Sequence, residues 1–189
     1  GLSATGAIHS TNYLKFPDQL VKSTYIGFGA GSGGTTDIEN TAVGYQALMD
    51  LNGSGSYENT AVGYIAGASI RGATDFRNTF IGAEVAALAG TGSGGNPSFD
   101  NTFVGTGAYR NNSQGYSNTG LGRWAMFWHN THESGNVAVG DRAMQASRSG
   151  SDNVSIGKDS GGGTVVTNWG HSNISIGSYG GAQMNNGDN

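Results

Sequence analysis

The sequence contains no cysteine, few basic residues and no long apolar run, and each of these shortages excludes a class of protein. Without cysteine there is no disulfide framework and no thiolate metal site. The nine Lys and Arg residues are scattered singly and form no basic stripe, so we expect no nucleic-acid partner. No stretch approaches the roughly 20 apolar residues of a membrane span, and we expect no membrane insertion.

Large apolar side chains are also scarce, whereas glycine accounts for 35 of the 189 residues. A low apolar content indicates disorder when the net charge is high. Here the net charge is only -4. The chain must therefore fold by placing its few apolar side chains at regular intervals.

A pentapeptide of the type Asn-Thr-Ala-Val-Gly supplies this regularity, because it occurs nine times. Consecutive copies are 17 to 23 residues apart, and the first copy, 23–27, has Ser in place of Asn. The other eight copies begin with Asn40, Asn59, Asn78, Asn101, Asn118, Asn136, Asn153 and Asn173. The closing glycines are Gly27, Gly44, Gly63, Gly82, Gly105, Gly122, Gly140, Gly157 and Gly177.

Each pentapeptide predicts a short β-strand. Its second and fourth residues are mostly β-branched and share one face of a strand, so we expect that face to be buried in every copy. The third residue, on the opposite face, varies among Ala, Phe, Tyr, Gly and Ser. Three residues after the closing glycine a small residue usually returns, which predicts a second, closely packed strand.

Units this short cannot bury a face alone, but stacked in register they can. The sequence therefore predicts an all-β fold, a parallel β-solenoid of about nine coils over residues 23–181. Residues 1–22 would be a lead-in or a connection to an upstream shaft, and 182–189 a C-terminal tail. We expect the Asn side chains to form a hydrogen-bonded ladder along the stack and the closing glycines to occupy corners. The faces with small residues would pack against further copies of the chain around a closed symmetry axis.

Two segments carry a family resemblance: Asn-Thr-Ala-Val-Gly-Tyr-Gln-Ala-Leu at 40–48 and Asn-Thr-Ala-Val-Gly-Tyr-Ile-Ala-Gly at 59–67. They resemble bacteriophage tail fibre repeats of the kind that often precede an endosialidase-type intramolecular chaperone. They are also similar to the head repeats of trimeric autotransporter adhesins, whose Val-Ala-Ile-Gly motif is approached at 137–140 and 154–157. The resemblance implies a parallel homotrimer of left-handed β-rolls that binds a cell surface.

The long, variable spacing and the aromatic inserts fit a phage fibre better than an adhesin head. We therefore expect an extracellular virion tail fibre that contacts other virion tail proteins and a bacterial cell-surface glycan or outer-membrane receptor. The alternatives are the head of an adhesin on a bacterial surface and a purely structural fibre shaft.

Catalytic patterns are weak, and we expect neither an enzyme nor a cofactor. The segment 158–162 resembles the nucleophile segment of chymotrypsin-like proteases, but Ser160 occupies the small-residue position of the repeat and no His segment accompanies it. Polysaccharide cleavage needs two carboxylates in a groove. The acidic residues that directly precede the repeat Asn are instead expected to form a solvated row: Glu39, Glu58, Asp100 and Asp152.

Aromatic side chains in the inserts are the candidate binding residues, because flat rings with polar neighbours stack on the apolar faces of sugars. The alternative is that they fill the core or the interface between chains. The spacing of His129 and His132 does not match the pattern of axial metal sites in fibres, so we expect no metal. The candidate ligand-binding set is Trp124, Phe127, Trp128, His129, His132, Tyr109, Tyr116 and Trp169.

Overall fold

The computed structural model describes residues 23–32, 39–50, 57–69, 76–88, 98–111, 115–128, 133–162, 167–168 and 170–181. Within these ranges the chain forms strands and turns and no helix. Accordingly, the described part holds no helix of the length and hydropathy needed to cross a membrane. Residues 1–22 and 182–189, expected to be a lead-in and a tail, lie outside the described residues.

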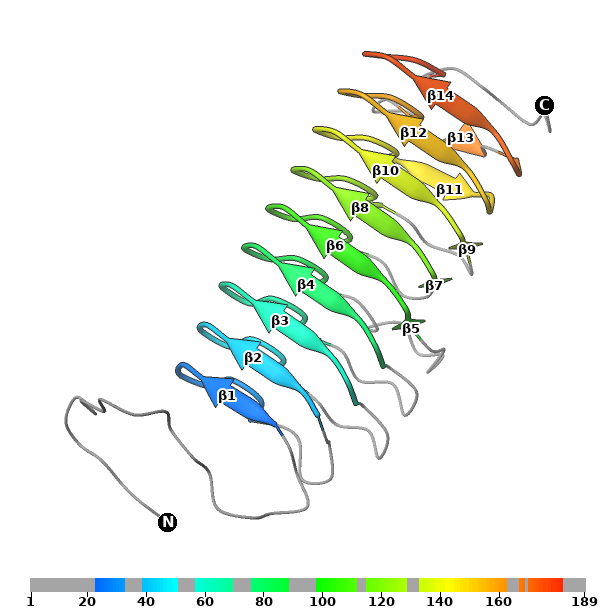
Figure 1. The fold of residues 1–189 in the computed structure, drawn as a ribbon. Coiled ribbons are helices and arrows are strands. Elements are labelled where there is room, and N and C mark those ends of the chain that lie inside the picture. Colours follow the sequence, from blue (N-terminus) through cyan, green and yellow to red (C-terminus); the bar gives the residue numbers. More distant parts are fainter. Residues whose placement is uncertain are drawn as a thin grey trace, which may run out of the picture.

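A nine-stranded parallel sheet runs along the molecule, and each pentapeptide contributes one strand to it (Figure 1). Neighbouring strands pair without a shift, so that Thr41 lies opposite Thr60 and Thr60 opposite Thr79. The all-β, parallel β-solenoid prediction is confirmed. The strands are β1 (Thr24–Ile26), β2 (Thr41–Val43), β3 (Thr60–Val62), β4 (Thr79–Ile81), β6 (Thr102–Val104), β8 (Thr119–Leu121), β10 (Val137–Val139), β12 (Val154–Ile156) and β14 (Ile174–Ile176).

Two smaller parallel sheets stack alongside the main sheet. One contains β5 (Ser98–Phe99), β7 (Gly115–Tyr116) and β9 (Glu133–Ser134), and isolated bridges extend it from Phe99 to Phe76 and Tyr57. The other contains β11 (Ser147–Ser149) and β13 (Thr167–Asn168). We call the segment from one pentapeptide to the next a coil.

The buried face of the main sheet is the opposite of the one expected. Ala42, Ala61 and Phe80, at the third position of their pentapeptides, are fully buried, whereas the flanking β-branched residues point outward. The narrow interior accounts for this, because the inward third residues lie against small residues from the turn of the same coil. The aliphatic side chains at the fourth position form an outward row that is half-buried or exposed: Ile26, Val43, Val62, Ile81, Val104, Leu121, Val139, Ile156 and Ile176.

The predicted second strand is a turn instead. The second and fourth residues after each closing glycine adopt positive φ, as at Gln46 (52°) and Leu48 (48°). Their backbone N–H groups bond to neighbouring coils: Gln46 N donates to Phe28 O at 2.9 Å and Leu48 N to Ala66 O at 2.9 Å. The small residue between them points inward and is buried, as expected of this position.

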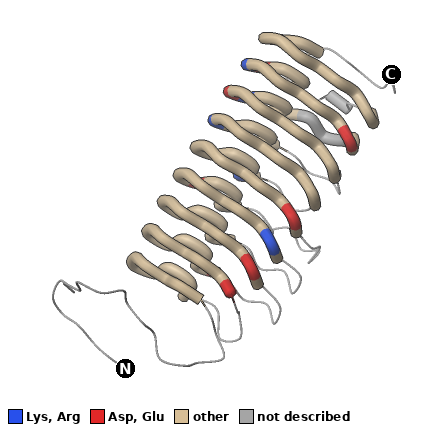
Figure 2. Tube along the Cα trace, viewed as in Figure 1, with Lys and Arg blue, Asp and Glu red and all other residues tan. Residues whose placement is uncertain are grey.

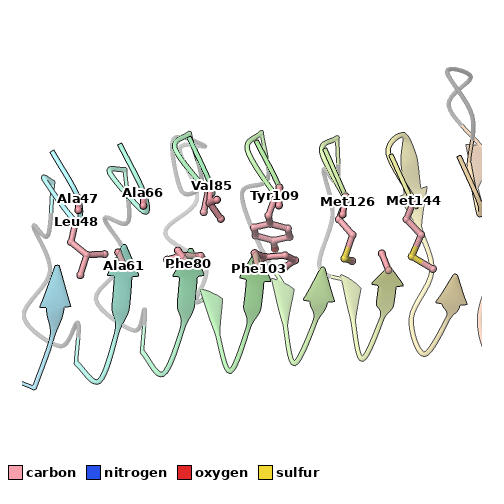
Figure 3. Close-up of a cluster of buried hydrophobic side chains, with 14 of the residues drawn as sticks. Ala47, Leu48, Ala61, Ala66, Phe80, Val85, Phe103, Tyr109, Met126 and Met144 are labelled. Carbon is pink, nitrogen blue, oxygen red and sulfur yellow. The ribbon is translucent and has the colours of Figure 1, made fainter. Parts of the chain in front are cut away.

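The hydrophobic core is one cluster that runs along the inside of the stack (Figure 3). Its largest members occupy the middle coils, where Phe103 stacks on Tyr109 with ring centroids 4.0 Å apart. The residues that form it are Ala42, Ala47, Leu48, Ala61, Ala66, Phe80, Val85, Ala86, Phe103, Ala108, Tyr109, Ala125, Met126, Ala138, Ala143 and Met144.

The repeat Asn side chains form the predicted ladder. The Oδ1 atoms of the first seven accept the backbone N–H of the Asn one coil later: Asn101 N donates to Asn78 Oδ1 (3.1 Å) and Asn118 N to Asn101 Oδ1 (2.9 Å). Asn101 Nδ2 also donates to Asn78 Oδ1 (3.1 Å) and to Gly115 O (2.8 Å). All eight Asn residues are buried, so these bonds satisfy groups that water does not reach.

The closing glycines occupy corners that no other residue fits. Gly105 has φ of 133°, and a Cβ there would overlap the backbone carbonyl of Gly122 in the next coil. The same overlap recurs along the stack and ends at Gly177, where a Cβ would meet nothing within 4 Å.

We predict that Asn101→Leu destabilises the protein by about 1 to 3 kcal/mol per chain, because it leaves the buried amide of Asn118 without its acceptor. Chemical denaturation measures the loss. Asn111→Leu, outside the ladder, is the control and should have a smaller effect. An unchanged unfolding midpoint for Asn101→Leu would show that these residues act only through turn geometry.

We predict that Gly105→Ala is more damaging than Gly177→Ala, although both glycines have positive φ. Backbone strain alone should cost on the order of 1 to 3 kcal/mol at Gly177. At Gly105 the overlap with the next coil adds to this strain. Thermal unfolding of the two variants gives the comparison, and equal losses would argue against close backbone packing at the corners.

Candidate functional site

Three aromatic side chains lie together in the turn that follows β8. Trp124 is the second residue after Gly122 and has φ of 56°, which turns its side chain outward while Ala125 points into the core. Hydrogen bonds to both neighbouring coils hold the turn: Trp124 N donates to Thr106 O at 3.0 Å and Trp128 N to Gln145 O at 2.8 Å. The backbone of this aromatic cluster, Trp124, Phe127 and Trp128, is thus fixed by the solenoid.

The rings of the aromatic cluster pack edge to face rather than in parallel. The centroids of Trp124 and Phe127 are 5.9 Å apart at 57°, and those of Phe127 and Trp128 are 5.2 Å apart at 72°. Trp124 lies over Gly107 of the preceding coil, where a Cβ would come within 2.7 Å of the indole. Trp128 remains 49% exposed, so the cluster presents apolar ring surface to solvent.

Charged side chains border the aromatic cluster. The Arg123 guanidinium lies 4.6 Å from the centroid of Trp124, and it donates two hydrogen bonds to the carboxylate of Asp141, at 2.8 and 3.1 Å. These bonds lower the pKa of Asp141 below its ordinary value of 3.8. One coil further, Arg142 pairs with Asp159 at 2.7 Å. The site therefore combines apolar ring surface with fixed hydrogen-bonding groups.

Tyr109, expected in the ligand-binding set, belongs to the core. Its side chain is 1% exposed and stacks on Phe103, on the inner side of the coil (Figure 3). The physical reason is its position. Tyr109 is the fourth residue after its closing glycine, and side chains at this fourth position point inward, whereas Trp124 is the second residue after Gly122. We therefore assign Tyr109 to the core instead of the ligand-binding set.

Tyr116 lies in a different aromatic group from Trp124. It ends a stack of four parallel rings, Tyr57, Phe76, Phe99 and Tyr116, with centroids 4.9, 5.2 and 4.9 Å apart. Tyr116 is 43% exposed. The sequence signal for this stack is that each ring stands two residues before the repeat Asn, a regularity that the sequence analysis missed.

A second stack, Phe28, Tyr45 and Tyr64, was also missed. Each of these residues directly follows a closing glycine, and all three are exposed. The centroids are 5.8 and 5.4 Å apart, with the rings within 14° of parallel. Because each ring covers the face of its neighbour, mainly edges are left for a ligand.

Three residues of the candidate set, His129, His132 and Trp169, lie outside the described residues. Among the residues that are described, no group of three or more His, Cys, Asp or Glu side chains is arranged to hold a metal ion.

The acidic residues before the repeat Asn are exposed, as expected of a solvated row (Figure 2). Asp100 is paired with Arg77 of the preceding coil at 2.6 Å. Ser160 is fully buried, and its hydroxyl lies 2.9 Å from that of Ser175. Ser160 therefore contributes to the interior of the coil, where a substrate has no access.

Comparisons with protein-family models, with curated proteins and with solved structures find no match to this chain. The features of this molecule that bear on function are therefore the repeat, the outward face of the sheet and the aromatic cluster.

We predict that acid loosens the contact between Arg123 and Trp124. A carboxyl group with a lowered pKa keeps its ion pair above its ordinary pKa and loses the pair as the pH falls through the lowered value. The indole N–H resonance of Trp124 should therefore shift below about pH 4. Asp141→Asn should abolish that transition, whereas Asp152→Asn, in the solvated row, should leave it. A transition that survives Asp141→Asn would contradict the assignment.

Proposed function

We propose that the chain is a receptor-binding segment of a bacteriophage tail fibre, which attaches to a glycan on the bacterial host surface without catalysis. In this proposal three parallel copies, each a left-handed rod of about nine coils, form one fibre. Its place is the virion, outside the host cell, next to other tail proteins.

The outward face of the main sheet supports an assembly of several copies. Along it the fourth-position aliphatic residues repeat at every strand, and Val62, Ile81 and Leu121 are each more than a third exposed. A continuous apolar stripe on a soluble rod is unfavourable unless a partner covers it. Parallel copies around a closed axis would bury all their stripes at once, and the family resemblance favours three copies.

The aromatic cluster carries the binding proposal. Trp124, Phe127 and Trp128 are held by backbone bonds to two coils, so little loop entropy remains to be lost on binding. Exposed indole surface suits the apolar face of a sugar ring, and Arg123 and Asp141 offer hydrogen bonds to hydroxyl groups. A site of this kind binds weakly, but three copies per fibre and many fibres per particle raise the avidity.

A purely structural shaft is the second candidate. The stack of Phe28, Tyr45 and Tyr64 favours it, because these exposed rings are used to cover one another. The head of an adhesin on a bacterial surface is a third, for which the aromatic cluster would serve the same binding role.

We predict that the double variant Trp124→Ala, Trp128→Ala loses most adsorption to host cells, because it removes the exposed indoles. Adsorption of the purified protein is measured against a panel of bacteria. The matched control is Tyr45→Ala, Tyr64→Ala, which removes two exposed stacked rings and should adsorb like the parent. Both variants must match the parent in unfolding temperature and sedimentation. Equal adsorption by all three proteins would favour the structural shaft.

A further inference from the structure

The interior of the solenoid changes character toward its C-terminal end. The hydrophobic core has its last member at Met144. In the following two coils, the inward position of the strand is Ser155 and then Ser175, where the earlier coils have Tyr, Ala or Phe and, in β8, Gly. The small-residue position of the turn becomes Ser160 and then Gly180. Among the described residues of these coils, the inward positions therefore hold almost no apolar side chain.

Their polar interior is only partly satisfied. The hydroxyl groups of Ser160 and Ser175 lie 2.9 Å apart. The Ser155 hydroxyl is fully buried and has no hydrogen-bond partner within the described structure. Such burial disfavours folding, because the hydroxyl loses its water without replacing it.

The outward face changes in the opposite direction. Each strand of the main sheet has two outward residues, the first and the third. In the strands from β1 to β8 the first is Thr and only the third is aliphatic. In β10, β12 and β14 both outward positions are aliphatic: Val137 and Val139, Val154 and Ile156, Ile174 and Ile176. Ile174 and Ile176 are 70% and 71% exposed. At this end the apolar side chains are thus on the outside of the rod and the polar ones on the inside.

We propose that β12, β14 and the turns that follow them take their hydrophobic core from other copies of the chain, and that this part of the rod is folded only in the assembly. Val154, Ile156, Ile174 and Ile176 from each copy would form that shared core. This inference depends on the homo-oligomer in the proposed function and specifies which part of it holds the copies together most strongly.

We infer that another copy of the chain covers this surface, because the spacing of the outward side chains along the rod matches that of a parallel copy. The outward pairs repeat once per strand, at about 4.8 Å along the rod. A parallel copy has the same period and the same side-chain sizes, so it can contact every strand in register. The surface also continues the aliphatic row of the earlier strands, and one partner can therefore cover the whole row.

The test uses the full chain with Val154→Thr and Ile174→Thr. Thr occupies this position in six other pentapeptides, so the substitutions are compatible with the strand. The matched control is Val43→Thr with Val62→Thr, which also removes two outward aliphatic side chains but lies over the Ala and Leu core. Hydrogen exchange is followed at Gly157 and Gly161 for the C-terminal coils and at Gly44 and Leu48 for the control region, since all four amides bond to neighbouring coils.

The C-terminal variant should increase exchange at Gly157 and Gly161 by about tenfold or more and leave Gly44 and Leu48 protected. The control should change exchange by no more than a few-fold at either place. Equal effects of the two variants, or full protection of Gly157 in a dissociated chain, would overturn the inference.

A second pair of substitutions tests whether the loss of protection is caused by the lack of an apolar interior or by nonspecific destabilisation. Ser155→Ala with Ser160→Ala gives these two inward positions the residues of the coil before, Ala138 and Ala143. In the background of Val154→Thr and Ile174→Thr it should restore part of the protection at Gly157. Failure to restore any protection would contradict the role assigned to the polar interior.

The two proposals can fail separately. An oligomer whose Gly157 protection is insensitive to Val154→Thr and Ile174→Thr overturns this inference and leaves receptor binding standing. An oligomer with the predicted exchange pattern that does not adsorb to cells overturns receptor binding and leaves this inference standing.

Discussion

Consecutive coils stay in register because a buried Asn side chain in each coil accepts the backbone N–H of the Asn in the next. The closing glycines let the backbones approach closely at the neighbouring corner. The coils differ in length, yet the main sheet pairs the same positions from β1 to β14. The regular turn after each closing glycine can therefore carry different side chains in different coils, and in the coil of β8 it carries the aromatic cluster.

This close register fixes the interior as well as the backbone. With turn and strand packed against each other, the inside of a coil holds Ala, Ser or Gly at most positions, and the largest rings, Phe103 and Tyr109, fit there by stacking on each other. The β-branched residues that stabilise the strands are left outside. The solenoid thus gains order along its axis from hydrogen bonds and leaves much of its aliphatic surface on the outside of the rod.

The strands, the Asn ladder and the glycine corners were predictable because a strict repeat requires the same local structure in each copy. The inward face was not. Alternation shows that a strand has two faces, but the face that points inward depends on the width of the coil, which arises from packing. The left-handed turn was also hidden, since Gln46, Leu48 and Trp124 are not residues that favour positive φ. Without that turn, sequence spacing could not separate inward Tyr109 from outward Trp124, although it located the aromatic cluster.

The central claim is that the outward row of the main sheet forms a core shared between copies. Sedimentation equilibrium and light scattering on the intact chain at micromolar concentration test it most directly. The account predicts a mass close to three times 19.3 kDa and the frictional ratio of a rod. A stable, folded species of 19.3 kDa that keeps its β-sheet signal on dilution would contradict it.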